Sequence, residues 1–225
     1  MKLRPITATA FTLIEMLVVM AVIAILASII LSVNGYAQKK SAMIRAEGEI
    51  AAMSAACASY KGDFGSYPQD SSGDTDALCP YLHGDPSVSE YQKGSIALYK
   101  ALSGDAKPGS DPEPPAGPND KPDGRSETKA YFEFRPAQLQ KNAAGEVQYI
   151  KDPWGNAYGY STNASTAEAT FRRKLEKNPN TIRPTVGKGS AGYNPTYDLW
   201  STGGVLSKNT AEALEPDRKR WVKNW

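Results

Sequence analysis

The residue with the clearest chemical potential is Glu15, the only charged residue in an apolar run from Phe11 to Val33. A run of about 20 apolar residues is long enough to cross a bilayer as a helix. A carboxylate at the centre of such a segment costs about 2.5–3.5 kcal/mol, and by default it has a functional reason. Glu15 lies near one end of the run, where the cost is smaller. We still expect it to need a partner.

A short leader precedes this run, and its basic residues are Lys2 and Arg4. The leader, the stretch AFTLIE at residues 10–15 and the apolar run together resemble the class III signal of type IV pilins and their secretion relatives. The resemblance implies that a prepilin peptidase cuts between Ala10 and Phe11 and methylates the new amino group of Phe11. It also implies that Glu15 is the residue used for subunit addition.

Physical chemistry agrees with that implication. In an apolar bundle of helices, the carboxylate of Glu15 on an incoming copy can pair with the Phe11 amino group of a neighbour, so that two costly charges neutralise one another. Two simpler interpretations stay open. A signal-peptidase leader has an apolar core of about 7–15 residues and a small-residue cleavage site, whereas this run is longer and residues 33–37 match such a site poorly. The other is an ordinary single-span anchor in which Glu15 has no role.

The helical pattern continues beyond the apolar run. Apolar residues recur every three or four positions and predict one amphipathic helix to about Tyr60, ended by Gly62 and Gly65. The stripe that would pack against a globular head consists of Met43, Ala46, Ile50, Met53, Cys57, Tyr60 and Phe64. The opposite face carries the charged residues Lys40, Arg45, Glu47, Glu49 and Lys61.

The remaining sequence predicts a small α+β head. A short helix is expected over 95–102, and strands are expected over 130–135, 146–150, 158–161 and from 197 into the loop at 203–204. Residues 105–125 are rich in Pro, Gly and Asp and form no core element. The predicted organisation is a leader (1–10), a membrane or filament-core helix (11–33), its amphipathic continuation (34–62), a variable region with a Pro-rich loop (63–129) and an antiparallel β-sheet domain with a C-terminal loop (130–225).

Four further segments strengthen the resemblance. They resemble segments of the major pseudopilins of type II secretion and occur in the same order along the chain. They are YKGDFGSYP (60–68), DPWGNAY (152–158), YDLWSTG (197–203) and the terminal Asn224-Trp225. The resemblance implies a long N-terminal helix packed on a small antiparallel sheet. Residues 69–129 and 162–192 are longer than in common members of that family.

The sequence does not decide whether the chain binds a metal ion or forms a disulfide. The resemblance implies a calcium site in the C-terminal loop, for which Asp198 and Asp217 are weak candidates. Calcium prefers six to eight oxygen ligands, and the cations of 218–220 oppose it. We expect Trp221 and Trp225 to hold the tail on the sheet instead. Cys57 and Cys79 would lie in an oxidising compartment, where they are either joined or two buried thiols.

The sequence lacks the marks of an enzyme or a nucleic-acid-binding protein. It has one histidine, His83, in a loop-like context, no G-x-S-x-G or phosphate-binding motif, and a net charge of +2 without a long basic run. We interpret DPWGN as a turn covered by Trp154, not as a catalytic group. No cofactor is expected apart from a calcium ion in the loop just described.

The resemblance therefore implies a filament subunit of a type II secretion pseudopilus, held in the inner membrane by a single span with its C-terminal domain in the periplasm. Its partners would be other copies of itself, prepilin peptidase, an inner-membrane assembly platform and minor pseudopilins. The alternatives are a subunit of a surface type IV pilus, and a membrane-anchored binding module that does not polymerise and uses the Pro-rich loop.

Overall fold

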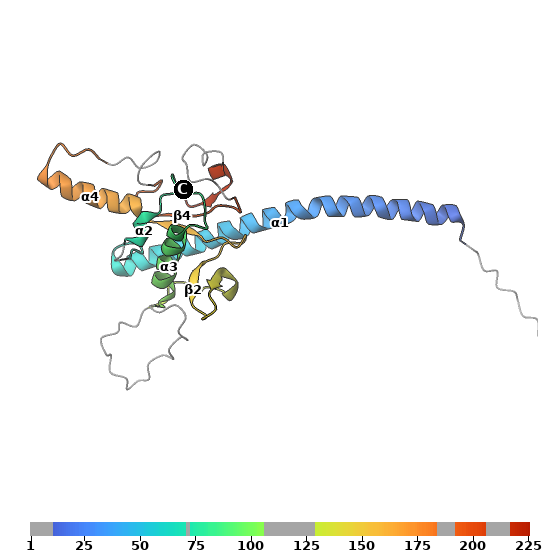
Figure 1. Cartoon of the computed structure of the whole chain (residues 1–225), viewed down its shortest axis with the longest axis horizontal. Coiled ribbons are helices and arrows are strands. Elements are labelled where there is room, and N and C mark those ends of the chain that lie inside the picture. Colours follow the sequence, from blue (N-terminus) through green and yellow to red (C-terminus); the bar gives the residue numbers. More distant parts are fainter. Residues whose placement is uncertain (1–10, 71–72, 106–128, 184–191, 206–216) are drawn as a thin grey trace, which may run out of the picture. The chain divides into compact units, whose positions relative to one another are not determined.

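The computed structural model describes residues 11–70, 73–105, 129–183, 192–205 and 217–225, with the backbone alone for 30–34. The chain divides into two compact units, residues 1–42 and 43–225, and the long helix α1 crosses their boundary. The described elements are a long N-terminal helix, shorter helices and small antiparallel sheets (Figure 1). The α+β, pilin-like fold class predicted from the sequence is confirmed.

Helix α1 (Leu13–Phe64) is 52 residues long and uninterrupted. It passes through Gly62, which was expected to help end it, and stops before Gly65, whose φ of 76° lies in the left-handed region that favours glycine. The predicted apolar stripe is confirmed from Ala46 to Cys57, where its members are at most 4% exposed. Phe64 is 61% exposed, so the buried part of the stripe ends near Tyr60.

The main sheet of the second unit contains β3 (Gly159–Ser161), β4 (Asp198–Ser201) and β5 (Val222–Lys223) in the order β3-β4-β5, all antiparallel. A separate hairpin pairs β1 (Leu139–Lys141) with β2 (Val147–Ile150). The expected strands at 146–150, 158–161 and 197 onward are confirmed.

The strand predicted over 130–135 is wrong, because that segment has no ladder and the hairpin partner is β1. Its aromatic side chains are still used, since Tyr131, Phe132 and Phe134 pack against the core. A segment of irregular backbone that packs aromatic side chains into a core can have the same amino-acid composition as a β-strand. Composition alone therefore could not separate the two.

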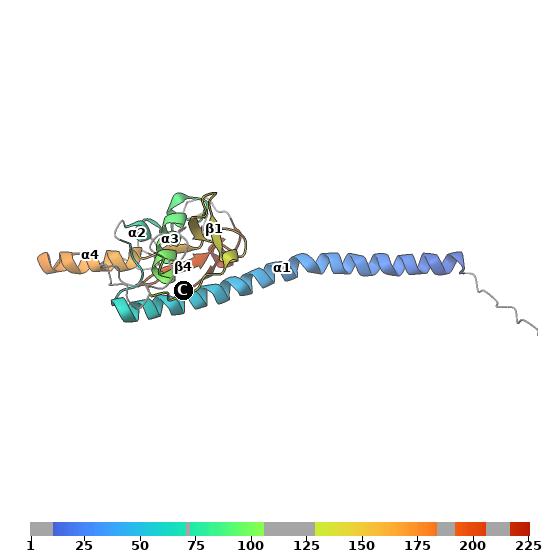
Figure 2. The same cartoon turned by 90° about the horizontal axis from the view of Figure 1, so that it is seen from below.

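Three short helices complete the second unit: α2 (Asp74–Ala77), α3 (Ser89–Ser103) and α4 (Asn163–Lys177) (Figures 1 and 2). Helix α3 contains the helix expected at 95–102 and is longer at its start. It lies so close to β3 that a Cβ atom at Gly94 would collide with the carbonyl oxygen of Tyr160. Single-turn 3₁₀ helices lie at Pro136–Gln138 and Arg218–Arg220.

The core is made of two apolar clusters. The larger joins the buried stripe of α1 to α3 and to the strands, including Leu98, Ile150 and Leu199. The smaller surrounds Trp200, which stacks on Trp221 at 6.1 Å between ring centroids. Trp225 stacks on Tyr193 at 4.7 Å. The two C-terminal tryptophans thus hold the tail against the sheet, as the sequence predicted.

Several predictions fall on parts of the chain outside the described residues. The leader (1–10) and nearly all of the Pro-rich segment are among them. Within the part that is described, no helix has a stretch long and apolar enough to span a membrane.

Candidate functional site

The first turn of α1 brings together the residues that the leader motif singled out. Glu15 Oε2 accepts hydrogen bonds from the Thr12 backbone N–H at 2.9 Å and from the Thr12 hydroxyl at 2.7 Å. In return the Glu15 N–H donates to Thr12 Oγ1 at 3.3 Å. Thr12 precedes the first helical residue, so this is a capping box of the T-x-x-E type, which satisfies amide groups that have no partner inside the helix.

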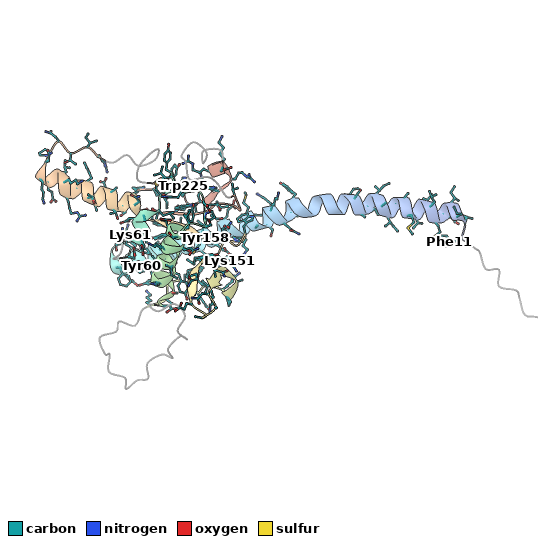
Figure 3. All side chains as sticks on the ribbon, viewed as in Figure 1. Phe11, Tyr60, Lys61, Lys151, Tyr158 and Trp225 are labelled. Carbon is teal, nitrogen blue, oxygen red and sulfur yellow. The ribbon has the colours of Figure 1, made fainter. Side chains whose placement is uncertain are left out.

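This capping was missed by the sequence analysis, although the signal for it was present. The pattern Thr-x-x-Glu directly before an apolar run is the sequence signature of a helix start. The same bonds fix where the carboxylate lies. Both bonds that Glu15 accepts within the described part of the chain use Oε2, which leaves Oε1 to accept from a further group. Phe11 lies immediately before this turn (Figure 3).

The surface of α1 that follows is apolar on every side. The large apolar side chains of residues 11–29 are each between 47% and 84% exposed, including Leu13, Leu17, Met20 and Ile25. At about 25 cal/mol per Å² of apolar surface, covering such side chains is strongly favourable. The arrangement is therefore suited to association with other apolar surfaces, and Glu15 is the charged group within it.

The comparisons with known proteins bear on this same end of the chain. Residues 8–31 match the family model described as the prokaryotic N-terminal methylation motif. The match spans the junction of Ala10 and Phe11 and contains Glu15, and it supports a class III leader of the type IV pilin kind. Searches among curated proteins and among solved structures found no match.

A second constellation links the DPWGN turn to the main sheet. Asp152 Oδ1 accepts the backbone N–H groups of Trp154 at 3.0 Å and Asn156 at 2.8 Å. Asp152 Oδ2 accepts the hydroxyl of Ser201 at 2.6 Å, and Ser201 Oγ accepts the Gly203 N–H at 3.1 Å. Burial raises the pKa of the Asp152 carboxyl, against the lowering effect of these donors.

This geometry explains why DPWGN and YDLWSTG occur together. The carboxylate of Asp152 holds its own turn with one oxygen and the end of β4 with the other. Trp154 covers the turn and contacts Gly204, where a Cβ atom would meet the indole ring. The interpretation of DPWGN as a structural turn is supported, and the link to Ser201 was missed because sequence does not show which strand end faces the turn.

The weak calcium candidates are not brought together as a metal site. Asp198 is 2% exposed and accepts the backbone N–H groups of Tyr193 and Asn194, each at 2.8 Å. Burial raises its pKa to about 6. Asp217 stands just before the 3₁₀ helix of 218–220. Within the described residues, no three His, Cys, Asp or Glu side chains gather at a distance that would hold a metal ion.

A cation occupies the neighbourhood of the tail instead. The guanidinium of Arg218, 4% exposed, donates to the Tyr193 hydroxyl at 2.7 Å and lies over the ring of Tyr81 at 4.8 Å. A buried cation on aromatic faces is favourable. From the sequence, Arg218 counted only as a charge that repels calcium, and nothing in its spacing indicated this packing role.

Cys57 and Cys79, which the sequence left either joined or free, are both free and buried in the structure. Burial raises the pKa of Cys57 to about 12 and raises that of Cys79, so neither thiol is a ready nucleophile. His83 is half-buried, and its Nδ1 lies 3.0 Å from the backbone nitrogen of Cys79. It forms part of a turn in the described structure.

Proposed function

We propose that this chain is a structural filament subunit, processed by prepilin peptidase and polymerised into a type II secretion pseudopilus. The observation that carries the proposal is the N-terminal methylation motif at residues 8–31, with Glu15 presented at the first turn of an apolar helix. The resemblance of YKGDFGSYP, DPWGNAY and YDLWSTG to major pseudopilins favours the secretion filament over a surface pilus.

The assembly step in this proposal is a charge pairing. After cleavage, the protonated amino group of Phe11 on one copy donates to the carboxylate of Glu15 on the next. Thr12 occupies Oε2 of that carboxylate and orients it, so Oε1 remains for the amine. Burying both charges together among apolar side chains avoids the cost of burying either one alone.

The proposed setting is the inner membrane, with a single span and the C-terminal domain in the periplasm. Lipid covers the apolar surface of residues 11–29 before assembly, and neighbouring copies cover it afterwards. Prepilin peptidase, an inner-membrane assembly platform and minor pseudopilins are the proposed partners, and nucleic acid is not among them.

The work proposed for this chain is mechanical. A prepilin motif of this kind is associated with structural subunits. The carboxylates that are buried in the head, Asp152 and Asp198, accept backbone N–H groups and hold turns. Those contacts support a framework role for both residues.

N-terminal peptide mass spectrometry on membrane-extracted protein tests the proposal, using cells with and without prepilin peptidase. We expect a mature chain that starts at N-methylated Phe11 only where the peptidase is present. Retention of residues 1–10 in both strains, or a cut beyond Val33, would overturn the proposal.

A second experiment separates a filament subunit from a processed but non-polymerising anchor. Glu15→Ala should leave cleavage at Phe11 intact and abolish sheared filaments, since the pairing carboxylate is gone. Glu47→Ala, which removes an exposed carboxylate from the same helix, is the control. Equal filament yield from both variants would favour the binding-module alternative.

A further inference from the structure

Helix α4 has a packed half and an exposed half. Near its start Ala164 is buried, and the hydroxyl of Thr166 donates to Asp76 Oδ1 at 2.9 Å. From Arg172 to its end every residue of α4 is exposed. Figures 1 and 2 both show this half extending away from α2 and α3, which belong to the same compact unit.

An ion-pair cluster centred on Glu168 holds the chain that follows beside the middle of α4. Arg183 donates to both oxygens of Glu168, at 3.0 and 2.9 Å, and Arg172 also contacts Glu168 at 3.2 Å. Although such pairs are individually weak, the bidentate geometry positions the returning segment beside the helix. Glu168 and Arg183 are 15 residues apart in the sequence, so their contact joins α4 to the segment that follows it.

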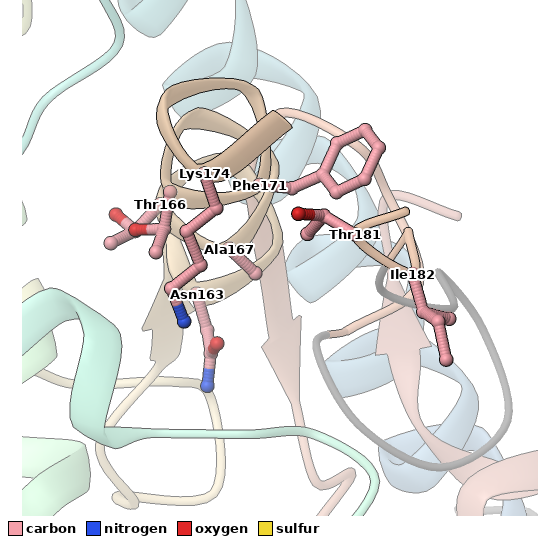
Figure 4. A pocket seen from close by; sticks show the side chains of 8 residues that line it. Asn163, Thr166, Ala167, Phe171, Lys174, Thr181 and Ile182 are labelled. Atoms are coloured by element: carbon pink, nitrogen blue, oxygen red, sulfur yellow. The ribbon is translucent and has the colours of Figure 1, made fainter. Parts of the chain in front are cut away.

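The space between α4 and the returning segment is an open groove with an apolar floor. Ala167, Phe171, Lys174, Thr181 and Ile182 contribute to its lining (Figure 4). Ile182 is 91% exposed and Leu175, on the same helix, is 38% exposed. We call this the α4 groove. Exposed apolar side chains within a charged rim are typical of an interaction surface.

The segment that forms the α4 groove carries a net positive charge. Residues 168–183 contain five cations and two anions, a net charge of +3, whereas the whole chain carries +2. Two grooves of this kind would repel one another, so α4 does not favour pairing with its own copy in a neighbouring chain. The partner must be anionic and must carry some apolar surface.

Such a surface exists on the same unit. Residues 73–93, which include α2 and the start of α3, contain four anions and one cation, a net charge of −3. Asp74, Asp85 and Glu90 are all partly exposed, and Leu82 is 43% exposed. We call these four residues the acidic patch. The cation, Lys93, contacts Asp74 at 3.5 Å.

We propose that the α4 groove of one copy binds the acidic patch of a second copy. The charges of the two surfaces match in size and are opposite in sign, and each surface carries exposed leucine or isoleucine. Because the two surfaces differ, the contact is heterologous, and contacts of that kind generate open helical polymers when they do not close into rings. The inference rests on the proposed filament function and assigns to the heads a contact separate from the helix core.

Charge reversal in the full chain tests this contact. One variant, Lys174→Glu with Lys177→Glu, reverses the groove, and a second, Asp74→Lys with Glu90→Lys, reverses the patch. A third chain carries all four changes and restores complementarity. The control is Lys100→Glu with Lys141→Glu, which makes the same charge change at exposed positions outside both surfaces. Filaments sheared from cells and cross-linked dimers of the detergent-extracted chain are both quantified.

We expect either reversed variant to reduce filaments and cross-linked dimers about tenfold, because several charge pairs are lost at every contact along the polymer. In the chain with all four substitutions, the yields of filaments and of cross-linked dimers should return to within about twofold of those of the original chain. The control should also stay within about twofold. Higher salt should weaken the dimers of the original chain, since exposed charges are screened over about 10 Å at 0.1 M.

Three results would overturn the inference. The first is a groove variant that behaves like the control. The second is a chain with all four substitutions that fails to recover. The third is an original chain that binds vesicles rich in anionic lipid through the groove, while the charge changes leave its filament yield unchanged. Failure of the proposed function looks different. In that case no variant, nor the original chain, gives filaments, while the cross-linked dimers still report whether the groove and the patch meet.

Discussion

The two halves of α1 differ both in apolar pattern and in environment. From Phe11 to Ile29 the large apolar side chains are at least 47% exposed, whereas Ala46, Ile50, Met53 and Cys57 are at most 4% exposed. The outer half is amphipathic, and its apolar stripe is covered by the head of the same chain. The inner half is apolar on every side, and its large side chains are exposed over residues 11–29.

Their polar groups differ in the same way. In the outer half, Glu49 lies on the charged face, where it accepts the Tyr158 hydroxyl at 2.7 Å and pairs with Arg45 at 2.9 Å. In the inner half, Glu15 accepts both of its described hydrogen bonds from Thr12 at its own helix start. One carboxylate completes a fold, and the other is available for a partner.

The largest effect that separates the two halves is expected from a pair of methionines. Met53→Ala should lower the free energy of unfolding of the head by about 2–5 kcal/mol, because it leaves a cavity beneath α3 and the strands. Met20→Ala makes the same chemical change at a side chain that is 67% exposed and should leave that free energy unchanged. Denaturant titration of the membrane-extracted chain measures both.

Equal destabilisation of the head by Met20→Ala and Met53→Ala would contradict the difference between the two halves of α1. A lower filament yield from Met20→Ala, with an unchanged free energy of unfolding of the head, would support it. That pattern would locate the partner of the inner half in the filament itself.

Sequence periodicity predicted α1 well because a long stripe averages many residues. The stripe from Met43 to Tyr60 needs no knowledge of its partner, since any core would bury it. The short elements were harder. Strand β1 has three residues and an ordinary composition, and α4 lies in a segment that looked inserted. Their stability comes from tertiary contacts such as that of Thr166 with Asp76.

The candidate site divides along the same line. Local motifs gave Glu15, and the Thr-x-x-Glu pattern contained its capping partner. The link from Asp152 to Ser201 joins residues 49 positions apart, and the buried Arg218 contacts Tyr81 across 137 positions. No spacing rule connects such residues, because their approach depends on how the strands are ordered in the sheet.

The next largest effect concerns how the head responds to pH. Burial raises the pKa of Asp198 to about 6, from an ordinary value of 3.8. A carboxyl with a raised folded pKa stabilises the fold below its unfolded pKa, and this contribution is lost as pH rises through the folded value. Between about pH 4 and 6 the head should therefore lose up to about 3 kcal/mol through this residue.

Asp198→Asn removes that titration, so the difference between the two stability curves should change only within this pH window. Denaturant titrations at several pH values measure the difference, and Asp63→Asn is the matched control at an exposed carboxyl whose pKa is lowered by Lys129 and Tyr131. A flat difference for Asp198→Asn would contradict the assignment. Glu15-dependent filament assembly should show no step attributable to Asp198.

A smaller effect is expected at the bond between the DPWGN turn and β4. Ser201→Ala removes the hydroxyl that donates to Asp152 at 2.6 Å and leaves a buried carboxylate oxygen without that donor. The expected loss is about 1–3 kcal/mol of head stability. Ser201→Thr keeps the hydroxyl, so it should lower the stability of the head by less than Ser201→Ala does. Equal losses from both variants would show that packing at this position, and not the hydrogen bond, is responsible.

The smallest effect is expected at the helix start, where the inner half alone is concerned. Thr12→Val keeps the backbone N–H that donates to Glu15 but removes the hydroxyl, which both donates to Oε2 and accepts the Glu15 N–H. Loss of such a cap costs about 0.5–2 kcal/mol of local helix stability. Amide hydrogen exchange should therefore speed up at residues 13–16 and stay unchanged in the head. Thr12→Ser retains the hydroxyl and should keep the slow exchange; if instead Thr12→Ser exchanges fast while Thr12→Val stays slow, the threonine methyl group and not the capping box holds the first turn.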